Sequence, residues 1–258
     1  MSFIQGEFQL VRKRCLNEKC YDFSIYSPEL AMQSKAGQFL HIKVDNHMLR
    51  RPISICEIDR KNNTVRFVFE ARGEGTKILS QYNDGDFIDI LGPLGNSFEI
   101  LDNEKSCIVV GGGIGIFPLL EVAKQYGSRS KAILGFRDKS AVVMEQDFKS
   151  ITSETFISTD DGSYCHKGNV CGLLATSLKQ VRPDIIYVCG PKPMLKAVAE
   201  IAIENGVRCQ VSLEERMGCG IGACLVCACK VKGENEDEFD FKHVCKDGPI
   251  FEAQKVIF

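Results

Sequence analysis

The chain has 258 residues, which exceeds the usual size of one domain and predicts two domains with an appendage. Apolar residues make up 44% and charged residues 26%, and the formal net charge of -2 argues against nucleic acid as a partner. The sequence has no apolar run of about 18 residues and no apolar segment behind its first basic residues. We therefore expect no membrane span, no secretion signal and a cytoplasmic location.

The first part of the chain, up to about residue 100, contains short apolar segments separated by turn signals, a pattern typical of an antiparallel barrel. The segments that predict strands are residues 39–44, 51–58, 64–71 and 87–95. One helix is predicted over residues 76–84, with Ile78, Leu79 and Tyr82 on one face.

From Cys107 onward the pattern alternates between strands and helices, which indicates a parallel sheet covered by helices on both faces. The predicted strands are residues 107–112, 131–136, 155–159, 184–190 and 208–213, and the predicted helices are 118–127, 168–181 and 192–206. Gly206 is expected to cap the last helix. After Leu213 the alternation stops.

In the first part, the sequence Arg51-Pro52-Ile53-Ser54 combines a cation, a rigid turn and a hydroxyl group at a strand. An arginine can bind a pyrophosphate through two parallel hydrogen bonds, as a dinucleotide-like flavin requires. The segment from Gly73 to Thr76 precedes the predicted helix and offers a second anion site at its N-terminus. Each segment alone is also compatible with an ordinary turn.

In the second part, a glycine-rich loop between a strand and a helix predicts a nucleotide site. Its glycines are Gly111, Gly112, Gly113 and Gly115. The strict G-x-G-x-x-G pattern fails at Ile116, so a tight strand-to-helix turn remains an alternative. Cys189 and Gly190 end another strand, and the carboxyl edge of an open α/β sheet is where ligands bind.

Four of the thirteen cysteines lie within the segment MGCGIGACLVCACKV. Cys219, Cys224 and Cys227, with Cys245 further on, follow the C-x4-C-x2-C…C spacing of plant-type [2Fe-2S] sites. Zinc sites prefer paired C-x2-C knuckles, so zinc is the less favoured alternative. Cys229 is not needed to complete the pattern and is interpreted as a packed thiol. The acidic segment 233–242 is predicted to form a solvent-exposed hairpin tip.

The ordered motifs RRPISI, GEGT, GPLGNSF, GGGIG, TDDGSY, CGPKPM and EERMGCGIGACLVC resemble the electron-transfer subunit of class 1B dihydroorotate dehydrogenase, within the ferredoxin-reductase-like superfamily. The resemblance extends over essentially the whole chain. It implies a flavin-binding β-barrel over residues 1–100, an NAD-binding Rossmann-like α/β domain over 101–212 and a small [2Fe-2S] domain over 213–258.

The resemblance also implies the roles of individual residues. It places the FAD contacts on Arg51, Pro52, Ile53, Ser54, Val68, Phe69, Glu70, Gly75 and Thr76. It places the cluster ligands on Cys219, Cys224, Cys227 and Cys245. Ile53 departs from the wider superfamily, in which many members place a tyrosine that stacks on the flavin.

The function that the resemblance implies is electron transfer in pyrimidine biosynthesis. A catalytic partner subunit would oxidise dihydroorotate on its own FMN, and electrons would pass through the [2Fe-2S] cluster and FAD to NAD+ in a heterotetramer of two subunits of each kind. No catalytic side chain is assigned. NAD is favoured by the resemblance, although Arg137 could receive the 2′-phosphate of NADP and Asp138 a ribose hydroxyl. The alternatives are a reductase subunit that couples NAD(P)H to ferredoxin or sulfur compounds, and a zinc-stabilised binding module.

Overall fold

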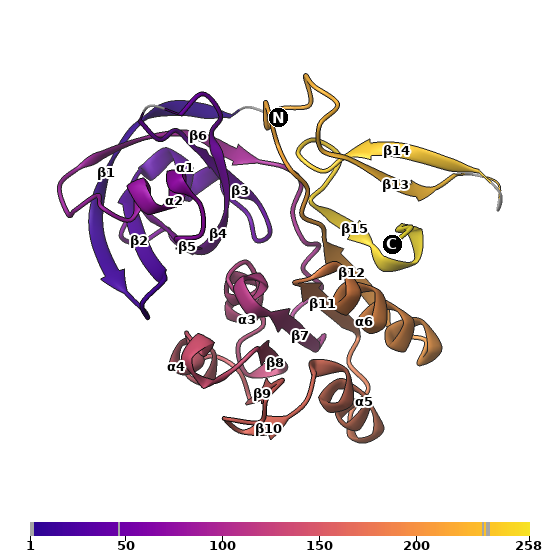
Figure 1. The fold of residues 1–258 in the computed structure, drawn as a ribbon. Coiled ribbons are helices and arrows are strands. Elements are labelled where there is room, and N and C mark those ends of the chain that lie inside the picture. Colours follow the sequence, from indigo (N-terminus) through magenta and orange to yellow (C-terminus); the bar gives the residue numbers. More distant parts are fainter. Residues whose placement is uncertain (1–2, 46, 234, 236–237) are drawn as a thin grey trace.

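The computed structural model describes residues 3–45, 47–233, 235 and 238–258. It consists of a closed barrel, a seven-stranded sheet with helices on both faces, and a projecting two-stranded hairpin (Figure 1). The predicted combination of an antiparallel barrel, an α/β sheet and a C-terminal cysteine-rich segment is confirmed. Within the described ranges, no helix has both the length and the apolar character needed to span a membrane.

Six antiparallel strands close the barrel in the order β1-β2-β5-β4-β3-β6. Their bounds are β1 (Ile4–Cys15), β2 (Cys20–Tyr26), β3 (Phe39–Ile42), β4 (Arg51–Asp59), β5 (Thr64–Glu70) and β6 (Phe87–Leu94). The sequence pattern did not predict β1 or β2. In β1 every second residue up to Leu10 is at least partly buried, but polar and basic residues mask this alternation in the sequence.

Two short helices flank the barrel, α1 (Pro28–Gln33) and α2 (Glu74–Leu79). The helix α2 begins two residues earlier than predicted, because Gly73 in extended conformation caps its start, and it ends at Leu79, five residues earlier than predicted. Its residues Ile78 and Leu79 nevertheless pack on the barrel core, as the predicted face requires.

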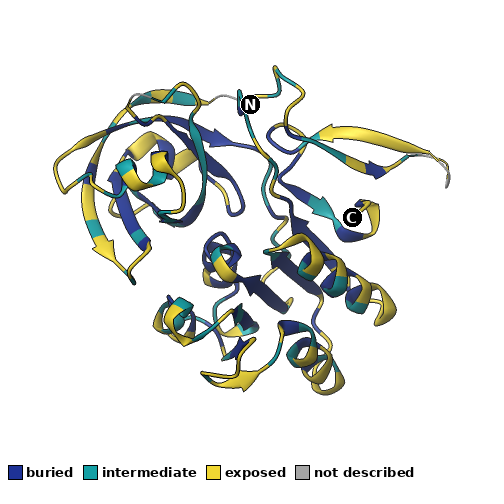
Figure 2. Ribbon diagram, in the orientation of Figure 1, coloured by how far each residue is buried: buried dark blue, intermediate teal, exposed yellow. Residues whose placement is uncertain are grey.

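The second sheet has the strand order β10-β9-β8-β7-β11-β12-β15. Its strands are β7 (Cys107–Gly112), β8 (Ser130–Phe136), β9 (Glu154–Thr159), β10 (His166–Lys167), β11 (Ile185–Cys189), β12 (Arg208–Ser212) and β15 (Ile250–Glu252). All neighbouring strands are parallel except β12 and β15. All residues of β7 are buried, as expected for a strand covered on both faces (Figure 2).

Helices cover both faces of this sheet (Figure 1). The helical segments are η1 (Gly113–Ile116), α3 (Leu119–Tyr126), η2 (Gly127–Arg129), η3 (Lys139–Ala141), α4 (Glu145–Lys149), α5 (Val170–Gln180), α6 (Lys192–Glu204) and η4 (Ala253–Lys255). The helix α3 packs on the face that carries Val109, whereas α5 and α6 pack on the face that carries Ile108 and Val110. Gly206 follows α6 with a φ of 62°, in the left-handed conformation expected of a cap.

The C-terminal segment forms the hairpin of β13 (Ala228–Lys232) and β14 (Phe239–His243). Residues 234, 236 and 237 of the predicted acidic tip lie outside the described residues. The chain then returns through β15, which pairs with β12. The segment predicted as a third domain thus contributes a strand to the α/β sheet, a connection that the sequence pattern did not reveal.

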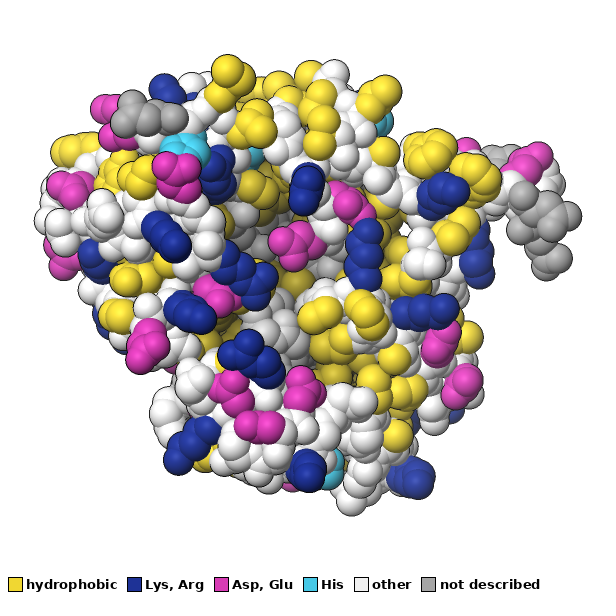
Figure 3. Space-filling model, viewed as in Figure 1, with side chains coloured by type: hydrophobic (Ala, Val, Ile, Leu, Met, Phe, Trp, Pro, Cys, Tyr) yellow, Lys and Arg dark blue, Asp and Glu magenta, His cyan; other side chains and the backbone are white. Residues whose placement is uncertain are grey.

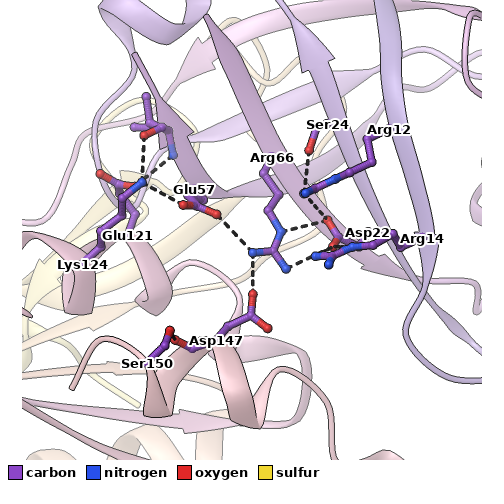
Figure 4. A network of polar contacts seen from close by, with 11 residues as sticks. Arg12, Arg14, Asp22, Ser24, Glu57, Arg66, Glu121, Lys124, Asp147 and Ser150 are labelled. Carbon is purple, nitrogen blue, oxygen red and sulfur yellow. Dashed lines mark hydrogen bonds and ion pairs between the residues drawn. The ribbon is translucent and has the colours of Figure 1, made fainter. Parts of the chain in front are cut away.

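A buried ionic network joins the barrel to the α/β domain (Figure 4). Arg66 on β5 donates to Asp22 at 2.9 and 3.1 Å, to Glu57 at 3.1 Å and to Asp147 of α4 at 2.7 Å. Asp22 is fully buried. One guanidinium group therefore binds both domains.

A second set of contacts crosses the same boundary from α3. Glu121 Oε2 accepts the backbone N–H of Ile58 on β4 at 2.9 Å, and Lys124 Nζ donates to Glu57 at 2.8 Å. The barrel and the α/β domain are thus held in a defined relative position by buried polar contacts.

Candidate functional site

A cleft of about 600 Å³ lies where the barrel, the α/β sheet and the start of the C-terminal segment meet. The face shown in Figure 3 is hollowed between the barrel and the α/β domain. All predicted cofactor residues except Gly111 line this cleft. From the barrel these are Arg51, Pro52, Ile53, Ser54, Val68, Phe69, Glu70, Gly75 and Thr76, and from the α/β domain Gly112, Gly113, Gly115, Cys189 and Gly190.

The barrel wall of the cleft places a cation beside a helix N-terminus. A Cβ on Gly75 would lie 2.5 Å from Arg51 Nε, so only glycine lets the guanidinium group lie across the start of α2. The Thr76 hydroxyl accepts the backbone N–H groups of Arg72 and Gly73 at 3.0 and 3.2 Å and closes the turn. The N–H groups of Gly75 and Thr76 have no partner within the helix, which leaves them available to an anion.

The α/β wall lies at the carboxyl ends of β7 and β11. These parallel neighbours mark the point where the strand order reverses, because β8 lies on one side of β7 and β11 on the other. Ligands of open α/β sheets bind at such a switch point. Cys189 is half-buried and lines the cleft, whereas Cys107 and Cys209 are buried within their strands.

The glycine-rich loop serves packing as well as the cleft. A Cβ on Gly111 would lie 2.9 Å from Ile116 Cα, and one on Gly115 would clash with the Cys189 carbonyl group. Gly113 has a φ of 56° and open space around it. The loop continues into η1 and only then into α3. Gly111 therefore has the packing role expected of a tight strand-to-helix turn. The other three glycines of the loop, which line the cleft, are Gly112, Gly113 and Gly115.

Several lining residues were not singled out from the sequence. They are Phe39 on β3, Leu213, Glu215 and Met217 after β12, and Pro249 before β15. Leu213 and Pro249 meet through the backbone bond from Leu213 N–H to Pro249 O at 2.8 Å. The return of the chain through β15 brings Pro249 to the cleft, whereas Leu213, Glu215 and Met217 follow directly from β12. Glu215 and Met217 belong to the motif EERMGCG, but the motif did not predict that they line the cleft.

The four predicted cluster cysteines lie together as two linked pairs. The backbone N–H of Cys224 donates to Cys219 Sγ at 3.3 Å, and Cys227 Sγ lies 3.3 Å from Cys245 Sγ. The N–H of Gly222 donates to Cys245 Sγ at 3.2 Å and so links the two pairs. Among the described residues no three Cys, His, Asp or Glu side chains meet at the spacing of a single metal ion. Two pairs match the chemistry of a two-iron cluster, which takes two cysteines on each iron.

The loop environment changes the acidity of these thiols. Burial raises the pKa of Cys219, but backbone N–H donors from Ile221, Cys224 and Ala223 outweigh it and lower the pKa to about 6. Burial and the neighbouring Cys227 raise the pKa of Cys245 to about 12. Thiolates are the metal-binding form of cysteine, and the donors that stabilise Cys219 also suit the anionic sulfur atoms of a cluster.

Cys229 lies on β13, opposite Lys242, and packs against the apolar cluster below α6. Burial raises the pKa of its thiol to about 11. This position agrees with its interpretation as a packed thiol.

His41 is a further residue at this site that the sequence pattern did not indicate. It lies on β3, is 1% exposed, and its ring faces Gly220 in the cysteine loop. Burial, together with Arg50, lowers the pKa of His41 to about 4.

At the end of β8, Asp138 is already engaged by neighbouring groups. Its carboxylate accepts from Ser140 Oγ at 2.5 Å and from the Ala141 N–H at 3.2 Å, and it pairs with Arg137 at 2.9 Å. Ser140 and Arg137 hold the pKa of Asp138 at about 2. The carboxylate and the guanidinium group therefore neutralise one another.

Comparison with known families supports both halves of the site. Residues 7–98 match the oxidoreductase FAD-binding domain. Residues 214–257 match the iron-sulfur cluster binding domain of dihydroorotate dehydrogenase B. The predictions of FAD and of an iron-sulfur cluster are thereby confirmed.

Curated relatives match over nearly the whole chain. The dihydroorotate dehydrogenase B (NAD(+)) electron transfer subunit of Geobacillus thermodenitrificans is 42% identical over 257 residues, which cover 96% of each chain. The chain belongs to this family of electron transfer subunits. The member from Caldanaerobacter subterraneus is 42% identical over 254 residues, and the member from Enterococcus faecalis is 40% identical over 261. These matches cover 96% and 98% of this chain and 98% of each relative.

Solved structures place the family within a wider fold. An NADH-dependent reduced ferredoxin-NADP oxidoreductase is similar with a TM-score of 0.83 and 31% identity, over 97% of this chain and 89% of that one. A ferredoxin reductase of carbazole 1,9a-dioxygenase shares the fold at 18% identity and a TM-score of 0.67, over 80% of this chain and 67% of that one. The predicted ferredoxin-reductase-like architecture is confirmed.

Proposed function

We propose that the chain conducts electrons between a dihydroorotate dehydrogenase catalytic subunit and NAD+ in pyrimidine biosynthesis. One observation carries the proposal: the segment from Leu213 to Met217 lines the nucleotide cleft and packs in the apolar cluster that contains Cys227 and Cys245 of the cysteine loop. Bound FAD would supply the chemistry that connects them, because a flavin exchanges two electrons with a nicotinamide and one with an iron-sulfur cluster.

In this proposal the barrel holds FAD. Arg51 and the N–H groups of Gly75 and Thr76 neutralise its phosphates, while the other predicted barrel residues line its position in the cleft. Ile53 lines the cleft where a tyrosine would stack, so its aliphatic side chain would contact the flavin through dispersion alone.

The nicotinamide dinucleotide would bind opposite, at the ends of β7 and β11. Gly112, Gly113, Gly115, Cys189 and Gly190 border this wall of the cleft. We favour NAD over NADP, because Arg137 is paired with Asp138 and a 2′-phosphate there would meet a carboxylate. Gly111 would act through packing against Ile116.

We propose Cys219, Cys224, Cys227 and Cys245 as the ligands of a [2Fe-2S] cluster. The two pairs, and the backbone N–H groups directed at Cys219 and Cys245, support this set.

The partner would dock at the cysteine loop. Leu225 is 76% and Val226 59% exposed, and Ile221 is also exposed, although all three are apolar. Hydrophobic side chains gather over this loop between β12 and β13 at the top of Figure 3. An exposed apolar patch is typical of a protein interface. We propose that an FMN-containing catalytic subunit covers it, in a heterotetramer with two subunits of each kind.

The remaining assignments follow from the same proposal. None of the thirteen cysteines, all of them within the described ranges, forms a disulfide, which agrees with the reducing cytoplasm proposed for this chain. We keep the division into residues 1–100, 101–212 and 213–258 as functional units, although β15 joins the sheet of the second unit.

An anaerobic titration of the purified protein with NADH tests the cofactors and their connection together. We expect bleaching of the flavin absorbance, followed by the electron paramagnetic resonance (EPR) signal of a reduced [2Fe-2S] cluster. Protein without flavin and iron-sulfur absorbance would leave the zinc-stabilised module as the better description. Flavin bleaching without a cluster signal would disprove the connection.

A second candidate is a subunit that couples NAD(P)H to ferredoxin, favoured by the likeness to the NADH-dependent reduced ferredoxin-NADP oxidoreductase. The two functions are distinguished by adding dihydroorotate and an active catalytic subunit to the chain. NADH formation supports the first proposal, whereas a lack of NADH with rapid ferredoxin turnover supports the second.

A further inference from the structure

A buried histidine lies between the flavin strands and the cysteine loop. His41 is on β3 directly opposite Pro52 of β4, one of the residues that line the cleft. Its side chain points away from the barrel core that contains its neighbour Leu40, because successive side chains of a strand alternate between faces. His41 therefore faces the C-terminal segment.

On the same face of β3, Phe39 lines the cleft. The rings of Phe39 and His41 are 6.4 Å apart between centroids, at an interplanar angle of 79°. Phe39 also belongs to the apolar cluster that contains Cys227 and Cys245. Two neighbouring side chains of one strand thus extend from the cofactor cleft to the cysteine loop.

The cysteine loop is shaped around the imidazole. Gly220, next to Cys219, has a φ of 74°, and a Cβ there would lie 2.5 Å from His41 Nδ1. Both the backbone conformation and the space exclude a side chain at this position. The ring and the loop are therefore packed at the closest approach that the backbone allows.

The imidazole has unused hydrogen-bonding capacity. Neither His41 Nδ1 nor Nε2 makes a hydrogen bond within the described residues, and both are buried. The carbonyl groups of Arg50 and Cys219 lie near the ring but lack hydrogen-bonding geometry. An imidazole carries at least one N–H in any protonation state, so a buried donor without a partner remains. Buried donors in native proteins nearly always have an acceptor.

We propose that His41 is a positioning residue that holds the cysteine loop against the flavin strands and donates its ring N–H to a sulfur atom of the bound cluster. This inference rests on the cluster ligands proposed above. A hydrogen bond to sulfur stabilises the more negative, reduced cluster, so His41 would raise the reduction potential of the cluster. His243 on β14 also has a buried ring nitrogen, Nε2, without a partner among the described residues, and it provides a matched control.

The first test measures the cluster potential by EPR-monitored redox titration of the full-length protein with its cofactors. We expect His41→Leu to lower the ratio of reduced to oxidised cluster about tenfold at a fixed potential, which corresponds to about 59 mV for one electron. His41→Gln keeps an N–H donor and should recover part of this shift. Unchanged potentials in both variants would overturn the inference.

The second test detects the contact directly and does not need the leucine variant to load a cluster. Protein labelled with ¹⁵N only in histidine is reduced, and the nitrogen hyperfine coupling to the cluster is measured by pulsed EPR. We expect a coupling in the unaltered protein that persists in His243→Gln and disappears in His41→Gln. No coupling in the unaltered protein, or its loss in His243→Gln alone, would overturn the inference. If the unaltered protein gives no [2Fe-2S] signal at all, the proposed function fails instead.

Discussion

At the scale of single residues, five cysteines in the C-terminal segment differ in environment rather than in chemistry. Cys219, Cys224, Cys227 and Cys245 are linked by contacts below 3.5 Å, and backbone N–H groups point at the sulfur atoms of the first and last. Cys229 packs beneath α6 instead. The contacts around this group of four cysteines, and not the local density of cysteines, support the proposed ligands.

Substitution of Cys245 and of Cys229 should therefore have opposite outcomes. We expect Cys245→Ser to lose the [2Fe-2S] absorbance and most bound iron, because it removes one of the four proposed thiolates. Cys229→Ser should retain both, with a modest loss of stability from a buried hydroxyl. Iron analysis and visible absorbance after anaerobic purification make the measurement. Cluster loss in Cys229→Ser would show that the ligand set is wrong.

At the scale of elements, the sequence predicted the parts with simple periodicity. The strands β7, β8 and β11 and the helices α5 and α6 agree with their predicted ranges to within two residues at each end. The strand β1 was missed because most of its exposed positions carry polar and charged residues, and β2 was missed because the buried Asp22 and Ser24 interrupt its apolar residues. The return of β15 to the sheet could not be predicted, because pairing with β12 depends on tertiary contacts of a three-residue strand.

In the candidate site, too, residues in local motifs were predicted, whereas residues that depend on tertiary contacts were not. Cysteine spacing indicated the proposed cluster ligands, and the RPIS and GGGIG segments indicated part of the cleft lining, since these motifs carry their chemistry locally. Phe39 and His41 gave no signal, because each looks like an ordinary residue of the strand β3. Their importance comes only from facing a segment about 180 residues later in the chain.

The contact between the elements β2 and β5 predicts a large effect on stability. Asp22 is fully buried and accepts from both Arg14 and Arg66. Asp22→Asn should lower the free energy of unfolding by about 3 kcal/mol or more, because it removes the only fully buried carboxylate that, among the described residues, pairs with the buried guanidinium group of Arg66. Asp147→Asn removes only the partly exposed end of the network and should cost about 1 kcal/mol. Denaturant unfolding of both variants checks this, and equal losses would contradict it.

At the scale of the whole molecule, polar contacts between α3 and β4 join the α/β domain to the barrel across the boundary between them. Glu121 of α3 is buried there and accepts the Ile58 N–H. Burial raises the pKa of Glu121 above its ordinary value. Glu57 lies on the barrel side of the same boundary. Burial would raise its pKa, but hydrogen bonds and charge from Lys124 of α3 and Arg66 of β5 outweigh burial and lower the pKa. Two carboxyl groups at one boundary therefore respond to pH in opposite directions.

Stability measurements against pH should separate these two groups. A carboxyl group with a raised folded pKa binds more protons in the folded state, so the ionisation of Glu121 costs stability as the pH rises above about 4.5. Glu121→Gln should therefore gain stability relative to the unaltered protein between about pH 4.5 and neutrality. The lowered pKa of Glu57 means that its ionisation adds stability as the pH rises toward its unfolded pKa of about 4.5. Glu57→Gln should therefore become less stable than the unaltered protein over this pH range. Parallel pH profiles for both variants would show that burial does not dominate at Glu121.

The assembled enzyme provides the last test, because we propose that the exposed apolar side chains of the cysteine loop contact the catalytic subunit. Leu225→Asp adds a charge to this loop without touching a proposed ligand, so the isolated protein should keep its flavin and cluster absorbance. Burial of an unpaired carboxylate at an interface should weaken binding to the catalytic subunit at least about tenfold. Met32→Asp is the matched control, because Met32 is similarly exposed but lies on α1 of the barrel. Binding measured by calorimetry should fall only in Leu225→Asp, and equal binding by both variants would place the partner on another face.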